Sequence, residues 1–155
     1  MKNEISLRLL KLLISLFIIV AVVVAFASCK GGDDPGPGDG DEVSRVTNLL
    51  TSATWKLNSV TVDGVSKNLF SGMTLNFSAQ KTYSATKGDP VWTSTGTWSF
   101  IDAAAKTIIR DDQTTVTIES INESNLTLSL TWTKNTLGQG RVESIAGKNV
   151  FVFGK

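Results

Sequence analysis

The chain has 155 residues, which is enough for one domain and a tail. Its 15 Lys and Arg residues nearly balance 14 Asp and Glu residues, and this balance argues against nucleic-acid binding, which usually requires a strongly basic face. Histidine, the commonest general base and zinc ligand, does not occur. The single cysteine, Cys29, excludes an internal disulfide.

Residues 1–28 combine a positive start with an apolar run from Leu12 to Phe26 that is interrupted only by Ser15. This order, followed by small residues, is typical of a secretory signal peptide. The alternative is a retained membrane anchor. A helix rises about 1.5 Å per residue and a bilayer core needs roughly 20 apolar residues, so the run is short for a membrane span.

Cys29 directly follows the small residues at which a peptidase would cut. The run Phe26-Ala27-Ser28-Cys29 resembles the lipobox of bacterial lipoproteins, with Phe where Leu is more usual. The resemblance implies that Cys29 is diacylated, becomes the first residue after cleavage and is then acylated on its amine, for example with palmitate. Several acyl chains anchor a protein durably, whereas one anchors it only marginally. The alternative is ordinary secretion with an unpaired, reactive thiol.

Residues 29–42 form an acidic segment rich in Gly and Pro. This composition leaves nothing to bury and predicts a disordered tether behind the lipidated Cys. Acidic residues such as Asp33 and Asp34 also resemble a signal that sends some Gram-negative lipoproteins to the outer face of the outer membrane. We therefore expect a lipid anchor in the outer membrane and exposure at the cell surface, with the periplasmic face as the alternative.

Residues 43–155 are the expected folded domain and contain 18 Thr and 13 Ser. The apolar residues between Val43 and Leu50 follow the spacing of a short amphipathic helix. We expect this helix to span residues 43–52, with Ser44 as its N-cap. It should plug or cover one end of a sheet.

The remaining apolar residues mostly alternate with Thr and Ser, as in strands that have one buried face. The apolar positions that mark the eight expected strands are Trp55 to Val62, Met73 to Phe77, Tyr83 to Ala85, Trp98 to Phe100, Ile108 to Ile109, Val116 to Ile118, Leu126 to Trp132 and Val150 to Phe153. The alternation slips near Asn58-Ser59, where a β-bulge would restore it. Asp63-Gly64 is typical of a two-residue hairpin turn.

Short connections without helical crossovers predict that neighbouring strands pair antiparallel, as a meander. A meander of this size tends to close because closure removes both edges. We therefore predict an all-β fold, an antiparallel eight-stranded meander barrel whose first and last strands pair. The last strand is apolar on both faces, so we expect the N-terminal helix to cover its outer face.

Several short motifs add a family resemblance to this pattern. They are Trp55, Asp63-Gly64, Gly96-Thr97-Trp98, Arg141 and Gly147. Together with the N-terminal helix they resemble the small lipocalin-like domains of bacterial lipoproteins. In lipocalins, a Gly-x-Trp opens the first strand and an Arg near the last strand stacks on that Trp. Here Ala53-Thr54-Trp55 lacks the Gly, and Arg141 lies well before the terminal strand.

The residue types offer little catalytic chemistry, and we expect neither an enzyme nor a cofactor or metal site. Asp111-Asp112 is the only adjacent acid pair of the domain. Paired carboxylates can share a proton or bind a hard cation, but the polar residues that follow this pair favour a hairpin turn.

Binding is the more plausible activity. Seven residues are candidates to line a cavity in the barrel: Trp55, Phe77, Tyr83, Trp98, Leu128, Leu130 and Trp132. A barrel of eight strands either holds one small ligand or is filled by its own side chains. Trp92 is either an exposed contact residue or a lid on the mouth. We therefore expect non-covalent binding of a small apolar ligand or of an envelope protein partner, and as the alternative a ligand-free accessory module with a packed core.

Overall fold

The computed structural model describes residues 39–138 and 141–155. The predicted signal peptide, Cys29 and the first part of the predicted tether lie outside these residues. In the described part of the chain, no helix has the length and apolar character needed to cross a membrane.

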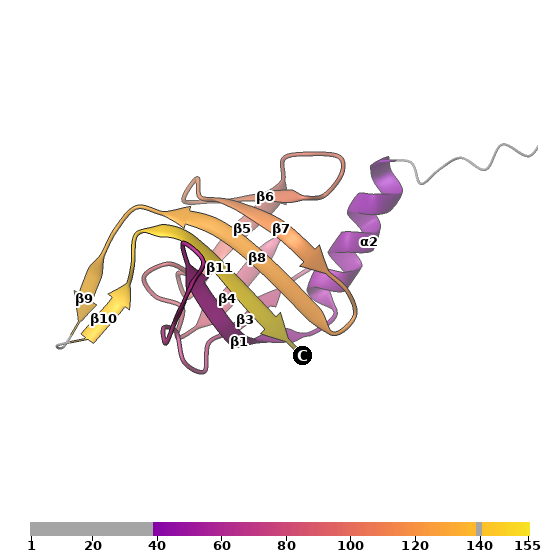
Figure 1. The fold of residues 1–155 in the computed structure, drawn as a ribbon. Coiled ribbons are helices and arrows are strands. Elements are labelled where there is room, and N and C mark those ends of the chain that lie inside the picture. The colour runs from indigo at the N-terminus through magenta and orange to yellow at the C-terminus, as the bar shows by residue number, and fades with distance from the viewer. Residues whose placement is uncertain (1–38, 139–140) are drawn as a thin grey trace, which may run out of the picture. The chain divides into compact units, whose positions relative to one another are not determined.

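The described residues form one helix and eleven strands (Figure 1). In chain order, they are α2 (Asp39–Thr51), β1 (Thr54–Val62), β2 (Val65–Lys67), β3 (Thr74–Phe77), β4 (Thr82–Thr86), β5 (Thr95–Phe100), β6 (Thr107–Arg110), β7 (Thr115–Ile121), β8 (Asn125–Trp132), β9 (Thr136–Gly138), β10 (Arg141–Ser144) and β11 (Gly147–Gly154).

Eight of these strands close into an antiparallel barrel, as predicted. Each of the strands from β3 to β7 pairs with the next along the chain. β11 then pairs with β8 on one side and with β1 on the other, and β1 pairs with β3. The predicted pairing of the first strand with the last is therefore confirmed, and it leaves no open edge among these eight strands.

The hairpin that opens the barrel also follows the prediction. The register of β1 against β11 shifts between Leu57 and Ser59, where the bulge was expected. Val62 pairs with Val65 across the turn at Asp63 and Gly64, whose φ angles are 49° and 79°. Two consecutive positive φ angles are the requirement of a tight hairpin turn, and Asp-Gly meets it at low cost.

The helix covers one end of the barrel, as predicted (Figure 1), but it differs from the prediction at its start and does not also cover the last strand. α2 begins at Asp39 rather than at Val43, so Ser44 lies within the helix and is not its N-cap. Glu42 lies in the first turn, where a negative charge stabilises the positive end of the helix dipole. α2 lies at one end of the barrel against β3 and β7 (Figure 1), and not over the outer face of β11 as expected. The outward Val150 and Val152 of β11 remain half-exposed.

A hairpin arm, formed by β9 and β10, was not predicted. It is a separate two-stranded sheet inserted between β8 and β11 (Figure 1). The indole N–H of Trp132 donates a 3.1 Å hydrogen bond to Ser144 Oγ at the base of the arm. Leu137 in β9 is 77% exposed. Arg141 opens β10, so its backbone lies in the arm and not beside the end of the barrel where Trp55 lies.

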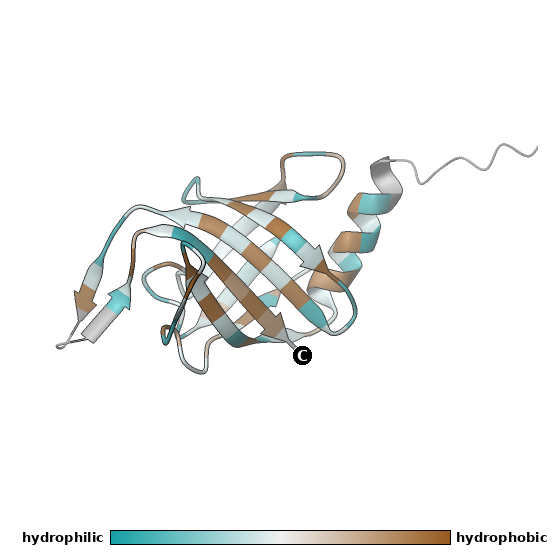
Figure 2. Cartoon of the chain, viewed as in Figure 1, coloured by the Kyte–Doolittle hydropathy of each residue, from teal (hydrophilic) through white to brown (hydrophobic). Residues whose placement is uncertain are grey.

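The interior of the barrel is one continuous apolar core. In most barrel strands, such as β3 and β4, hydrophobic residues alternate with polar ones, and the alternating bands are visible in Figure 2, whereas β11 is apolar on both faces. Phe151 and Phe153 of β11 are fully buried with stacked rings, and they face the inward side chains of the other strands. The period of two predicted for the strands thus places one face of each strand inside the barrel.

Candidate functional site

The seven predicted lining residues all belong to the barrel core or pack against it. Six of them are at most 3% exposed, and Trp132 is half-buried. They come from β1, β3, β4, β5 and β8, so the closed barrel does bring them together. Phe77 and Trp98 pack edge to face with ring centroids 5.5 Å apart. These side chains fill the interior as a packed core.

Trp55 forms the floor of the barrel at the end covered by α2. Its side chain is fully buried, and its indole N–H donates a 2.9 Å hydrogen bond to the carbonyl oxygen of Leu50 in the last turn of the helix. The Nζ atom of Lys155 lies 5.5 Å from the centroid of the Trp55 ring. The cation that faces the first-strand Trp therefore comes from Lys155, directly after the last strand.

A second cation joins the helix to the barrel. The Nζ atom of Lys81, in the turn between β3 and β4, lies 4.0 Å from the centroid of the Trp98 ring and 5.0 Å from that of Phe100. The same amine donates a 3.2 Å hydrogen bond to Thr47 Oγ1 on α2. Burial lowers the pKa of Lys81. Sequence reasoning missed this contact because no local pattern links Lys81 to the helix.

At the opposite end, the connection between β4 and β5 folds back into the barrel mouth. Trp92 is fully buried, so it is a lid on the mouth and not an exposed contact residue. Its ring packs edge to face on Tyr83 and on Phe151, with centroid distances of 5.7 Å and 6.2 Å. The indole N–H of Trp92 has no hydrogen-bond partner in the described part of the chain.

Arg110 lies beneath this lid and is only 2% exposed. Its Nη1 donates a 2.8 Å hydrogen bond to the carbonyl oxygen of Val91, and its Nε donates one of 3.2 Å to Asp112 Oδ1. The guanidinium group also forms an ion pair with Asp112 through Nη2 and Oδ2. Its carbon lies 4.8 Å from the centroid of the Trp92 ring. The cation is therefore paired and hydrogen-bonded, as a buried charge must be.

Asp112 lies in the turn that was predicted for Asp111-Asp112. The amide N–H of Gln113 donates a 3.0 Å hydrogen bond to the carbonyl oxygen of Arg110, which closes the turn. Burial raises the pKa of Asp112, but hydrogen bonds from Arg110 and Thr114 outweigh burial, and the pKa is lowered overall. The alternation of inward and outward residues in β6 could have identified Arg110 as a buried residue, because it follows the inward Ile108 by two positions.

Three of the hollows in the described surface lie on the outside and at the mouth of the barrel. One of about 460 Å³ lies on the outer face of β3, β4 and β5. Another of about 640 Å³ lies on the outer face of β7 and β8. A third, of about 600 Å³, lies at the mouth between residues 68–71, the turn after β4 and the arm. None of these three is enclosed by the core.

Metal binding has little support within residues 39–138 and 141–155, because no group of three potential acidic or thiol ligands gathers there. Two of the acidic side chains are already paired, Asp112 with Arg110 and Glu119 with Lys148. Comparison with protein-family models and with curated proteins finds no match to this chain.

Proposed function

We propose that this chain is a lipid-anchored protein of the bacterial cell envelope whose barrel acts by non-covalent binding through its outer surface. The lipobox-like run that ends in Cys29 supports the anchor, and the acidic residues that follow support the outer membrane and the cell surface. The resemblance to lipocalin-like lipoprotein domains supports the same proposal. The proposal includes no catalytic step, since the chain has no histidine.

The packing of the barrel interior is the observation that carries this proposal. Trp92 and Phe151 fill the mouth above the buried Arg110, and Trp55 fills the opposite end. Protein interiors are close-packed, so a ligand could enter only by displacing these side chains. A filled barrel favours an accessory module that recognises its partner on the outside over a carrier of small apolar molecules.

Native mass spectrometry of the full chain, purified from its own host, tests the proposal. We expect the mass of the acylated chain without a bound small molecule. The Trp92→Ala chain, prepared in the same way, is the matched control. It lacks the lid, so it shows whether a small molecule enters an open barrel during purification. A stoichiometric small molecule on the unaltered chain would contradict the proposal and favour ligand carriage.

The anchor is tested separately. Cys29→Ala should abolish labelling by a fatty-acid analogue and release the chain from membranes, because several acyl chains provide the attachment. Ser15→Ala changes the apolar run and leaves Cys29 intact, so it should keep both labelling and attachment. Unchanged membrane retention of the Cys29→Ala chain would show that the apolar run is itself the anchor.

A further inference from the structure

The outer faces of β3 to β6 and of the first half of β7 carry an uncharged polar surface, which we call the neutral face. Alternation along each strand points these residues away from the core. All but two of them are Thr or Ser. They are Thr74, Asn76, Thr82, Ser84, Thr86, Thr95, Thr97, Ser99, Thr107, Ile109, Thr115 and Thr117.

The strand register places these side chains side by side. Thr82 pairs with Thr97 across β4 and β5, and Ser84 pairs with Thr95. On the other side of β4, Asn76 of β3 pairs with Ser84. Directly opposite residues in an antiparallel pair have Cβ atoms about 4.5–5.5 Å apart. Across β3, β4 and β5, the polar side chains therefore form a continuous array and not an isolated group.

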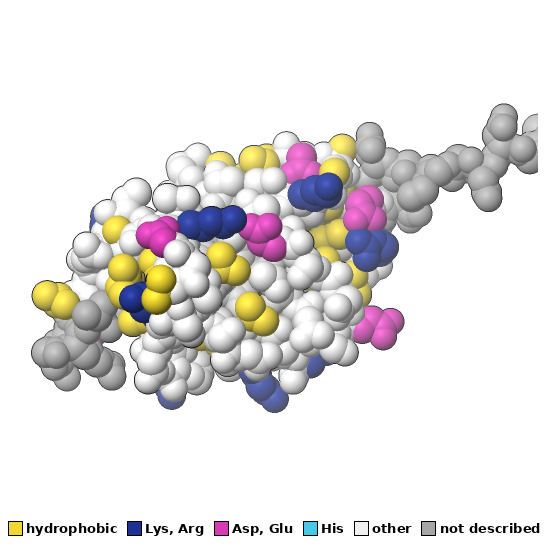
Figure 3. Space-filling view, in the orientation of Figure 1, with side chains coloured by type: hydrophobic (Ala, Val, Ile, Leu, Met, Phe, Trp, Pro, Cys, Tyr) yellow, Lys and Arg dark blue, Asp and Glu magenta, His cyan; other side chains and the backbone are white. Residues whose placement is uncertain are grey.

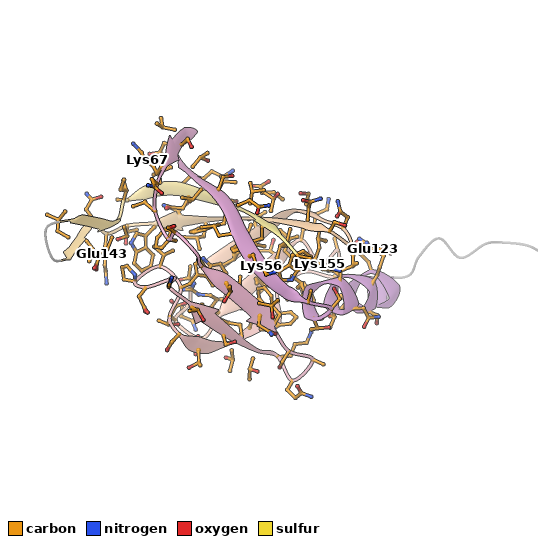
Figure 4. All side chains as sticks on the ribbon, turned by 90° about the horizontal axis from the view of Figure 1, so that it is seen from below. Lys56, Lys67, Glu123, Glu143 and Lys155 are labelled. Carbon is orange, nitrogen blue, oxygen red and sulfur yellow. The ribbon has the colours of Figure 1, made fainter. Side chains whose placement is uncertain are left out.

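Charged side chains lie around the neutral face. On one side, β1 presents the exposed Lys56 (Figure 4). On the other side, β7 presents Glu119, which forms a 3.0 Å ion pair with Lys148 of β11. Acidic and basic side chains cross the face of the molecule that is seen in Figure 3.

Strand propensity alone does not explain the neutral face. Thr is favoured in strands, but the outer faces of β1 and β7 show that this barrel also accepts charged residues there. Soluble surfaces usually mix both signs of charge over about 25–35% of their residues. The outer residues of β3 to β6 and the first half of β7 carry hydroxyl groups and no charge, so this surface needs a further explanation. The exposed Asp111, whose backbone N–H donates a 3.2 Å hydrogen bond to the carbonyl oxygen of Thr97, lies at its border.

A hollow of about 460 Å³ lies on this face, over β3, β4 and β5. The side-chain hydroxyls of Ser84, Thr95 and Thr97 line it, and none of them has a hydrogen-bond partner among the described residues. This volume falls within the range of roughly 300–1,000 Å³ that is typical of ligand sites. The hollow thus offers three hydroxyl groups that are free to bind.

We propose that the neutral face, with this hollow, binds an uncharged polysaccharide. Each Ser or Thr hydroxyl both donates and accepts a hydrogen bond, as do the hydroxyl groups of a sugar. Binding would bury no charge and so would avoid the cost of desolvating one. A nucleic acid or an acidic glycan would need cations, and the neutral face has none. The inference rests on the proposed function, since it names the partner class of the outer surface.

Retention of the protein on polysaccharide-coated beads tests the proposal. We would use the full chain in a polyoxyethylene detergent, which has no sugar head group, and beads that carry dextran, amylose, mannan or β-1,3-glucan. We expect retention on at least one of the four. It should persist when the salt concentration rises from about 0.1 M to about 1 M, because screening weakens only interactions between charges.

Matched variants locate the site. Thr97→Glu places a charge in the hollow and should weaken binding at least tenfold, whereas Thr97→Ser keeps the hydroxyl and should bind. Thr131→Glu makes the same change on the outer face of β8, outside the neutral face, and should leave binding unchanged. Thermal unfolding of each variant verifies that the barrel is intact.

Three results would overturn the proposal: no retention on any of the four polysaccharides, equal retention of Thr97→Glu and Thr131→Glu, or loss of retention at high salt. None of these three results contradicts the proposed function, provided that native mass spectrometry finds no small molecule bound to the chain. A bound small molecule would instead contradict the proposed function, whatever the beads retain.

Discussion

The guanidinium carbon of Arg110 lies 4.8 Å from the centroid of the Trp92 ring. Arg110 also donates to the carbonyl oxygen of Val91, so it holds the backbone and a side chain of the lid at once. A cation over the face of a Trp ring is attracted to it, and the attraction is stronger where water is excluded. Arg110 therefore holds the barrel mouth closed.

Substitution of Arg110 tests this role. Arg110→Ala should lower the free energy of unfolding by about 3 kcal/mol, because it removes a buried side chain, leaves a cavity under the lid and leaves the carbonyl oxygen of Val91 without its hydrogen-bond donor. Arg45→Ala is the matched control, since the Arg45 side chain is 54% exposed in its pair with Glu42. An exposed pair contributes about 0–1 kcal/mol. Urea unfolding monitored by Trp fluorescence measures both variants, and equal losses would contradict the role of Arg110.

The two indole N–H groups at opposite ends of the barrel predict different effects of Trp→Phe. The N–H of Trp55 donates to Leu50 in the helix, whereas that of Trp92 is buried without a partner in the described residues. Both variants lose a similar ring volume, so the hydrogen bond is the main difference. Trp55→Phe should therefore cost about 1–2 kcal/mol more than Trp92→Phe. Chemical denaturation gives the two free energies, and a larger cost for Trp92→Phe would contradict the assignment.

Gly147 starts β11 with a φ of 135°, and a Cβ atom on it would collide with the carboxylate of Asp63. That carboxylate accepts a 2.8 Å hydrogen bond from the backbone N–H of Lys148. Gly147→Ala should therefore destabilise the barrel by more than about 2 kcal/mol, through backbone strain and loss of this bond. Gly64→Ala is the control: its φ is 79°, but a Cβ atom would meet nothing within 4 Å. It should cost about 1 kcal/mol. Similar melting temperatures for the two variants would disprove the clash.

Regular alternation made the barrel predictable from the sequence. Leu126, Leu128 and Leu130 point inward at every second position, and the same period holds through β11. The interruption of the alternation at Asn58 predicted a β-bulge, because an extra residue at this point restores the period of two. Closure then followed from the apolar last strand, which needs a partner on each side.

The parts that could not be predicted depend on contacts between distant residues or on short segments. β9 and β10 are too short to show a period, so the arm left no pattern in the sequence. The early start of α2 was hidden because Gly and Asp near residue 39 are also typical of a linker. Trp92 lies in a loop, and it packs inward against Tyr83, Phe151 and Arg110, which are distant from it in the sequence.

The ion pair under the lid also predicts how acid affects stability. The pKa of Asp112 is lowered from its ordinary value of 3.8, so the folded state binds the proton less readily than the unfolded state does. The ionised Asp112 side chain therefore makes its full contribution to the free energy of unfolding above about pH 4, and this contribution is lost as the pH falls below that value. Asp112→Asn should remove this part of the pH dependence and leave Arg110 without its counter-ion at neutral pH. Glu42→Gln, in the exposed pair with Arg45, should change the profile little. Urea unfolding between pH 2 and pH 7 measures the profiles, and a Glu42→Gln profile that matches that of Asp112→Asn would refute the role of Asp112.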